Sequence, residues 1–198
     1  MIAGILLAAG AGARFGGRKL LALLEDGTPV GVRSARSLGS AVDRLLAVVR
    51  PGDLPLEALL RAEGAEVLPF PGASEGMGAS LAFGVSNAST ADGWVVALAD
   101  MPFVRPETVG AVVRRLKEGA LLVAPSFGGR RGHPVGFAGV LLPEILRLTG
   151  DAGARSILAR HASELVLLKS DDPGIVRDID VRSDLEPATS RMVNKLSD

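Results

Sequence analysis

The 198-residue chain contains no cysteine and no tyrosine, and aromatic residues make up only 4% of it. Without cysteine there are no disulfides, no thiolate ligands for zinc or iron–sulfur clusters, and no cysteine nucleophile. Because aromatic residues are scarce, the core must be built from Val, Leu, Ile and Ala. The sequence thus indicates a protein that folds through aliphatic packing, without covalent cross-links.

An excess of charge of either sign is also missing. The 22 Lys and Arg residues balance 22 Asp and Glu residues, so no overall field steers the protein onto nucleic acid or an anionic membrane. No apolar run reaches the roughly 18–20 residues that a membrane span needs. The apolar start, residues 2–9, is short and no Lys or Arg precedes it, so we expect no signal peptide. We therefore expect a cytoplasmic protein with no nucleic-acid or membrane partner.

Apolar residues make up 47% of the chain and the mean hydropathy is +0.32, which is enough for a full core in one domain spanning residues 1–198. Strands that alternate with helices of about ten residues are typical of an α/β fold. The sequence predicts a single-domain, three-layer α/β/α architecture with a mostly parallel, Rossmann-like sheet. The expected strands are 2–9, 45–49, 66–68, 93–99, 121–124, 165–168 and 176–181, with one that could run antiparallel in GHPVGF (132–137). The expected helices are 30–41, 54–62 (capped by Asp53), 77–86, 107–117, 141–148 and 154–161.

The first strand leads into a glycine-rich loop within LLAAGAGARFGGRKLL, residues 6–21. It is not a P-loop, because Lys19 is followed by Leu20 and not by the hydroxyl residue that a P-loop needs for magnesium. It is not a dinucleotide fingerprint either, because the third residue after Gly12 is Phe15, where that fingerprint requires glycine. The two best-known phosphate-binding loops are therefore excluded.

The loop still has the composition of an anion site. Its glycines let backbone N–H groups approach an anion closely. Arg14 offers two parallel hydrogen bonds to phosphate oxygens, and Lys19 offers a compact, movable charge. A solvated glycine turn with incidental cations is the alternative reading of the same residues.

This loop resembles the signature L-A-A-G-x-[GS]-x-R-[FM]-G-x-x-K of nucleotidyltransferases with a glycosyltransferase-A-like fold. Four further stretches, in the same order, are similar to the molybdenum-cofactor cytidylyltransferase group of MobA-like NTP transferases. They are EGMGASLAFGV (75–85), LADMPFV (98–104), RRGHPVGF (130–137) and GDAGARSIL (150–158). With these motifs in order, the resemblance extends over roughly residues 2 to 181.

The resemblance implies transfer of CMP from CTP to molybdopterin, with Mg²⁺ as cofactor and pyrophosphate as the second product. The pair Ala8–Ala9 is typical of the cytidylyl branch, whereas the guanylyl enzymes usually have L-A-G-G there. A molybdoenzyme or its maturation chaperone is then an expected partner. Transfer from GTP, a sugar- or alcohol-phosphate acceptor, and a non-catalytic nucleotide-binding regulator are the alternatives.

Two carboxylates are candidates for magnesium, which usually takes one or two carboxylates plus substrate phosphates and water. Asp100 ends the apolar strand 93–99 at the edge where α/β sheets bind ligands. The alternation of Val176, Asp178 and Asp180 places both aspartates on one face of an expected strand, and the resemblance assigns Asp180 to the metal. A turn-forming aspartate and a solvated acidic edge strand are the respective alternatives.

The resemblance makes Arg14, Lys19 and Asp100 the catalytic residues. The expected nucleotide-binding residues are Leu7, Ala8, Ala9, Gly10, Gly12, Arg14, Lys19, Pro71, Gly78, Ser80 and Asp100. The expected acceptor-binding residues are Arg130, Arg131 and His133, for which a hairpin tip with solvated arginines is the alternative.

Overall fold

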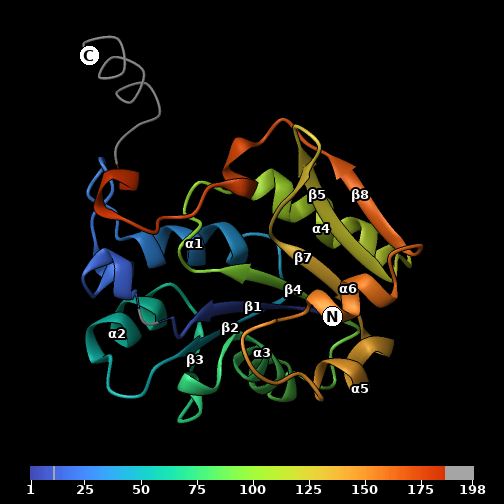
Figure 1. The fold of residues 1–198 in the computed structure, drawn as a ribbon, viewed down its shortest axis with the longest axis horizontal. Coiled ribbons are helices and arrows are strands. Elements are labelled where there is room, and N and C mark those ends of the chain that lie inside the picture. Colours follow the sequence, from blue (N-terminus) through green and yellow to red (C-terminus); the bar gives the residue numbers. More distant parts are fainter. Residues whose placement is uncertain (11, 186–198) are drawn as a thin grey trace.

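One mixed β-sheet organises the molecule (Figure 1). The structure is a computed structural model, and it describes residues 1–10 and 12–185. Within these ranges the sheet has eight strands: seven follow the order β3-β2-β1-β4-β7-β5-β6, and the eighth, β8, pairs with β5. Their bounds are β1 (Ile2–Ala8), β2 (Arg44–Val49), β3 (Glu66–Pro69), β4 (Gly93–Leu98), β5 (Leu122–Phe127), β6 (Arg130–Arg131), β7 (Val135–Ala138) and β8 (Leu165–Lys169).

Most neighbouring strands run parallel, as predicted. β1 lies between β2 and β4 and is parallel to both, so that Ile5 stands between Leu46 and Val96. β7 is antiparallel to β4 and to β5, which confirms the antiparallel strand expected within GHPVGF. β8 is parallel to β5. The mostly parallel α/β architecture is confirmed.

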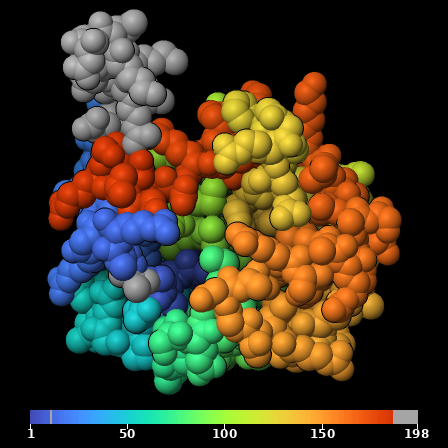
Figure 2. Space-filling view, in the orientation of Figure 1, coloured from blue at the N-terminus to red at the C-terminus, as the bar shows by residue number. Residues whose placement is uncertain are grey.

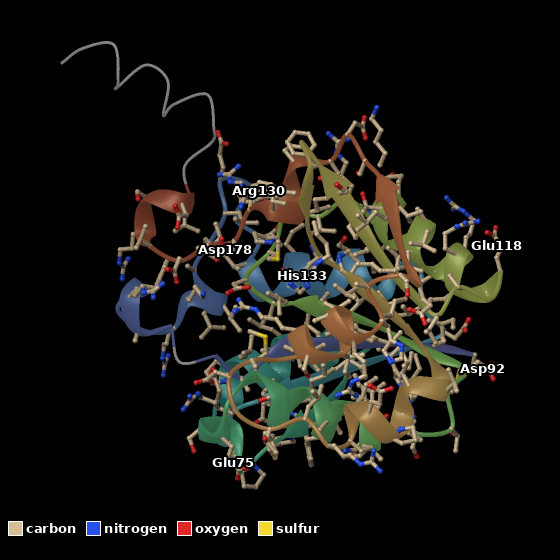
Figure 3. All side chains as sticks on the ribbon, turned by 45° about the vertical axis from the view of Figure 1, so that its right-hand side comes forward. Glu75, Asp92, Glu118, Arg130, His133 and Asp178 are labelled. Carbon is tan, nitrogen blue, oxygen red and sulfur yellow. The ribbon has the colours of Figure 1, made fainter. Side chains whose placement is uncertain are left out.

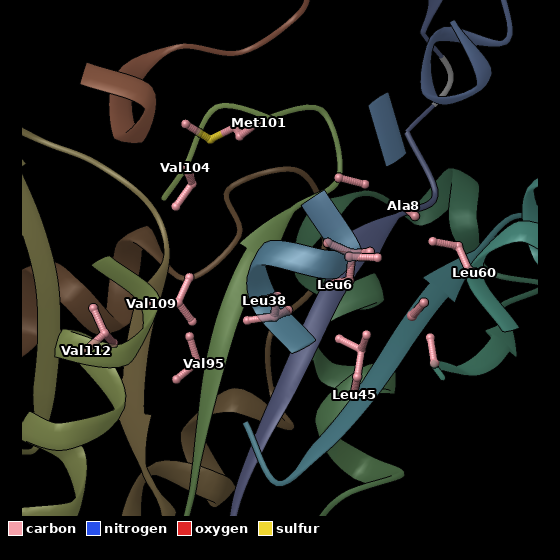
Figure 4. Packing of buried hydrophobic residues seen from close by; sticks show 14 of the residues in the cluster. Leu6, Ala8, Leu38, Leu45, Leu60, Val95, Met101, Val104, Val109 and Val112 are labelled. Carbon is pink, nitrogen blue, oxygen red and sulfur yellow. The ribbon is translucent and has the colours of Figure 1, made fainter. Parts of the chain in front are cut away.

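Helices cover both faces of the sheet, which gives the three-layer arrangement. Successive residues of a buried strand face opposite layers, so Leu6 packs with Leu38 of α1 on one face and Ile5 with Trp94 on the other. Figure 4 shows the first of these clusters, around α1 and the strands beneath it. The helices on the first face are α1 (Val30–Gly39), α2 (Leu54–Ala62) and α4 (Pro106–Lys117). Those on the second face are α3 (Met77–Ser86), α5 (Leu142–Ile145) and α6 (Arg155–Arg160). In the part of the chain that the structure describes, a helix with the length and apolarity of a membrane span is absent.

Two helix predictions need correction. The helix expected over 141–148 is shorter: a 3-10 helix over Gly139–Leu141 leads into α5, and the N–H groups of Arg147 and Leu148 then bond to carbonyls three residues back. That tighter bonding ends the α-helix early. Asp53 precedes α2 but contributes its backbone carbonyl, which accepts the Glu57 N–H at 2.9 Å, instead of a side-chain cap. Pro55 at the second helical position has no N–H, so one of the usual donors to a cap is missing.

The prediction of a strand over 176–181 is wrong. A 3-10 helix over Pro173–Val176 is followed by irregular chain. Ile179 is fully buried, but it packs in a small cluster with Phe15, Leu24 and Val30 and not in a strand ladder. Ile179 is therefore buried between the more exposed Asp178 and Asp180, and this alternation in the sequence resembles the pattern of a strand.

Candidate active site

Several of the predicted site residues, among them Lys19 and Asp100, lie where β1 and β4 end. The strand order reverses there, because the chain proceeds from β1 to β2 and β3 on one side and returns to β4 on the other. Such a reversal opens a crevice at the carboxyl edge of the sheet. Figure 2 shows a hollow at the centre of this face, between the blue N-terminal loop, the red segment of the 170s and the orange residues around α6.

Two ion pairs join residues that are far apart in the sequence. Lys19 Nζ lies 2.7 Å from Asp100 Oδ2, and the two side chains are only 11% and 25% exposed. Arg14 Nη1 lies 2.6 Å from Asp180 Oδ2, in a more open position. The hydrogen bond and the charge of Asp180 raise the pKa of the Arg14 guanidinium. Each cation expected to bind phosphate is thus held against a carboxylate expected to bind metal.

The glycine-rich loop is fixed by its own turns. Gly12 has a left-handed backbone (φ 58°) and its carbonyl accepts N–H groups from Phe15 and Gly17, which closes a short 3-10 turn over Ala13–Phe15. Arg18 is the non-glycine residue with positive φ (43°) among the described residues. Left-handed backbone costs a side-chain-bearing residue about 1–2 kcal/mol, so local strain directly precedes Lys19. The sequence pattern did not indicate this.

A cavity of about 260 Å³ lies at the same edge of the sheet, where it is lined by Leu7 of β1 and by Leu98 at the end of β4. Its apolar wall also includes Leu81, Val96 and Phe137. Its polar lining comes from two of the predicted acceptor residues, Arg131 and His133, and from Asp151 and Arg155 of the GDAGARSIL stretch. The cavity can therefore hold an apolar body with an anionic group near the two arginines.

His133 is the most unusual polar residue of this cavity. Its backbone N–H donates to the Ile175 carbonyl at 2.9 Å, whereas its buried Nδ1 finds no hydrogen-bond partner among the described residues. Burial lowers the pKa of the imidazole, against the opposing charge of Asp100. Figure 3 places His133 near the middle of the molecule, with Arg130 and Asp178 farther out. A neutral imidazole with a free nitrogen is thus available to a ligand.

The lowered pKa of His133 predicts a pH-dependent stability. Below its usual pKa of about 6.5 the unfolded chain binds a proton that the folded protein does not bind. The free energy of unfolding is therefore expected to fall as the pH drops below that value, with a slope of up to about 1.4 kcal/mol per pH unit. Urea unfolding between pH 7.5 and 5 should show this loss in the wild type and a weaker one in His133→Asn.

The other histidine provides the control for that measurement. His161 is partly exposed, its Nε2 lies 2.8 Å from Glu144 Oε1, and it does not line the cavity. His161→Asn should keep the pH dependence attributed to His133. Parallel stability curves for the wild type and His133→Asn would contradict the assignment.

The structure does not bring every predicted residue to the cleft surface. Gly78 and Ser80 are buried: the Gly78 N–H donates to the Gly150 carbonyl at 2.7 Å, and Ser80 Oγ donates to the Gly76 carbonyl at 3.1 Å. These groups are engaged within the protein, because the loop around Gly150 covers the start of α3. Ala8 and Ala9 are buried as well, Gly10 and Pro71 are exposed, and Arg130 lies on β6 outside the cavity lining.

The carboxylates suit a magnesium ion that is completed by its substrate. Groups of three or more His, Cys, Asp or Glu side chains poised to enclose a metal are absent from the described residues. Asp100 and Asp180 engage the cations through one oxygen each, Oδ2. Magnesium binds through one or two carboxylates together with phosphate oxygens and water. The donor set therefore fits this metal, with these two aspartates as the residues that would hold it.

Comparison with known proteins agrees with this arrangement. The model of the MobA-like NTP transferase domain matches residues 4–165. The chain is 33% identical over 190 residues to the purine catabolism protein PucB of Bacillus subtilis (strain 168), covering 89% of this chain and 90% of PucB. It is 30% identical over 187 residues to the nicotine blue oxidoreductase of Paenarthrobacter nicotinovorans, covering 90% and 92%.

A solved structure shares the fold over nearly its whole length. Rv0371c from Mycobacterium tuberculosis H37Rv superposes with a TM-score of 0.80 at 25% identity, covering 98% of this chain and 97% of that one. The family match spans β1 to the start of β8, and so includes the glycine-rich loop, Asp100 and the cavity. The chain belongs to the MobA-like NTP transferase family, and it is a nucleotidyltransferase.

Proposed function

We propose that this nucleotidyltransferase uses magnesium and transfers CMP from CTP to the terminal phosphate of molybdopterin. The observation that carries the proposal is the Lys19–Asp100 pair at the reversal of the strand order, on the edge of the sheet where Leu7 and Leu98 line the cavity. A cation for phosphate and a carboxylate for metal stand together there. The resemblance of five motifs to the cytidylyltransferase group supplies the identity of the two substrates.

The reaction requires little covalent chemistry from the protein. An oxygen of the acceptor phosphate attacks the α-phosphorus of CTP, and the bond from that phosphorus to the oxygen bridging to the β-phosphate breaks. The acceptor phosphate is ionised at neutral pH, so no general base is needed. Catalysis then rests on positioning and on neutralising charge.

The charged residues divide this work. Lys19 and Arg14 leave their carboxylate partners and bind oxygens of the triphosphate, which stabilises the charge that develops on the departing pyrophosphate. Asp100 and Asp180 are then free to hold magnesium. When bound, the magnesium ion polarises phosphate oxygens and neutralises part of their charge.

The cavity is the proposed site of the acceptor. Its apolar wall suits the body of a flat heterocycle, and Arg131 is placed to meet the phosphate. His133 would direct its free Nδ1 at a polar edge of the ring system. CTP is preferred to GTP on the strength of Ala8–Ala9, which is the pattern of the cytidylyl branch.

Pyrophosphate release tests this function. The protein is incubated with magnesium and CTP, GTP, ATP or UTP in turn, with and without molybdopterin. We expect release with CTP and molybdopterin together. Release with GTP would keep the chemistry and overturn the nucleotide preference, and release only with a sugar or alcohol phosphate would overturn the acceptor. Oxidation or reduction of nicotine blue without any nucleoside triphosphate would favour the chemistry for which the relative from Paenarthrobacter is named.

A further inference from the structure

Residues 172–180, here called the bridging segment, connect β8 to the site without forming a strand. Two main-chain hydrogen bonds hold the segment against the site. The Ile179 N–H donates to the Asp100 carbonyl at 2.8 Å, and Ile175 accepts the N–H of His133 at 2.9 Å. The segment thereby brings Asp180 to the same edge of the sheet as Asp100.

A buried carboxylate fixes the start of the bridging segment. The Asp172 side chain is 1% exposed, and its Oδ1 accepts the Gly174 N–H at 2.9 Å. Its Oδ2 accepts the Arg105 N–H and the Thr108 hydroxyl, each at 2.8 Å. One side chain therefore joins the bridging segment to the first turn of α4.

The backbone of the bridging segment lies in close contact with two neighbouring stretches of backbone. A Cβ at Gly174 would lie 2.0 Å from the Phe103 carbonyl oxygen, and a Cβ at Gly132 would lie 2.3 Å from the Ile175 carbonyl oxygen. Phe103 belongs to the short connection between Asp100 and α4. A shift of the bridging segment must therefore move the connection that follows Asp100.

Burying a carboxylate in order to hold two segments together has a cost in free energy. The nearest cationic atom, Arg105 Nε, lies 3.9 Å from Asp172 Oδ1, and the Arg105 side chain is half-exposed. Replacing a buried ion pair by well-packed apolar groups is often neutral or stabilising. The three directed hydrogen bonds of Asp172 thus point to a requirement for geometry more than for stability.

We propose that Asp172 is a positioning residue for nucleotidyl transfer, which sets where Asp180 stands relative to Asp100. The inference rests on the proposed function, since it takes these two aspartates as the residues that hold magnesium. Groups that hydrogen-bond directly to metal ligands typically contribute about 10–100-fold in metal affinity or activity. Asp172 acts through the backbone of the bridging segment, so we expect the lower end of that range.

The variant Asp172→Asn tests this role because it has nearly the same shape. Its amide group has one acceptor and one donor end, so one side of the present hydrogen-bond set faces a donor and is lost. Electron paramagnetic resonance of free Mn²⁺ measures metal binding in the presence of CTP. The half-saturating Mn²⁺ concentration is expected to rise about 10-fold, while the affinity for CTP in EDTA changes less than about twofold. Asp171→Asn, at a 95% exposed neighbour, should match the wild type in both measurements.

The outcomes separate this inference from the function on which it rests. Wild-type affinity for Mn²⁺ in Asp172→Asn, with only a lower melting temperature, would assign the residue to stability and overturn the proposal. A wild-type protein that binds no Mn²⁺ with CTP would overturn the proposed function as well. If Asp172→Asn does not fold, Thr108→Val removes one of the three hydrogen bonds and should raise the half-saturating Mn²⁺ concentration, and Thr108→Ser should restore it. An unchanged Thr108→Val would then overturn the proposal.

Discussion

Replacing Asp100 with asparagine is expected to lower the rate of CMP transfer by about 10²–10³-fold, the loss typical of removing one preorganised electrostatic group. The same change should leave the affinity for CTP in EDTA intact or make it tighter. In the free protein Asp100 holds Lys19 at 2.7 Å in a poorly exposed position. Without the carboxylate, Lys19 reaches the triphosphate without first breaking that pair.

Two measurements on the same variant separate the roles of Asp100. Initial rates of pyrophosphate release report on turnover, and titration calorimetry in EDTA reports on CTP binding. Glu118→Gln removes a carboxylate of equal charge at the far end of α4, where it pairs with Arg115, and should change neither. A variant Asp100→Asn that turns over normally would remove this residue from the site, and one that loses metal-free binding would contradict the exchange of partners.

The pairing of cations with carboxylates has a wider consequence for binding. Nucleotide alone must separate Lys19 from Asp100 and Arg14 from Asp180, and metal alone must do the same. When both bind, each released group finds a new partner of opposite charge. Magnesium and CTP are therefore expected to strengthen each other's binding, by the same factor in either order of addition.

The first loop and Asp100 could be predicted from the sequence because their signals are local. An apolar run that ends at a glycine or at an aspartate marks both the strand and the edge where the ligand binds. The familiar phosphate-binding loops are then excluded, because Phe15 stands where the dinucleotide fingerprint requires glycine and Leu20 where a P-loop requires a hydroxyl residue. Lys19 and Asp100 belong to two such endings, and parallel neighbouring strands bring their endings together.

The bridging segment could not be predicted in this way, because its contacts are between distant residues. Asp172 looks like an ordinary loop aspartate in SDDPG, and its partners Arg105 and Thr108 lie more than sixty residues earlier. Similarly, Gly78 reads as a free helix start until the loop around Gly150 is seen to cover it. Patterns of two or three residues report on neighbours in the chain, and these roles arise from packing across the fold.

Replacing Lys19 with methionine is expected to weaken CTP binding as well as turnover. A charge-assisted hydrogen bond contributes about 1.5–3 kcal/mol, which corresponds to a loss of roughly 10–150-fold in affinity. The variant also leaves Asp100 without its partner in the free protein, so Mn²⁺ binding without nucleotide should become easier than in the wild type.

That pair of opposite effects is the decisive feature of the Lys19→Met prediction. Lys117→Met makes the same chemical change at the exposed end of α4 and should alter neither CTP nor Mn²⁺ binding. If Lys19→Met lost affinity for both ligands, the residue would serve the fold of the loop and not the phosphate site. If CTP binding weakened while Mn²⁺ binding without nucleotide improved, Lys19 would be a phosphate ligand that competes with metal for Asp100 until the nucleotide arrives.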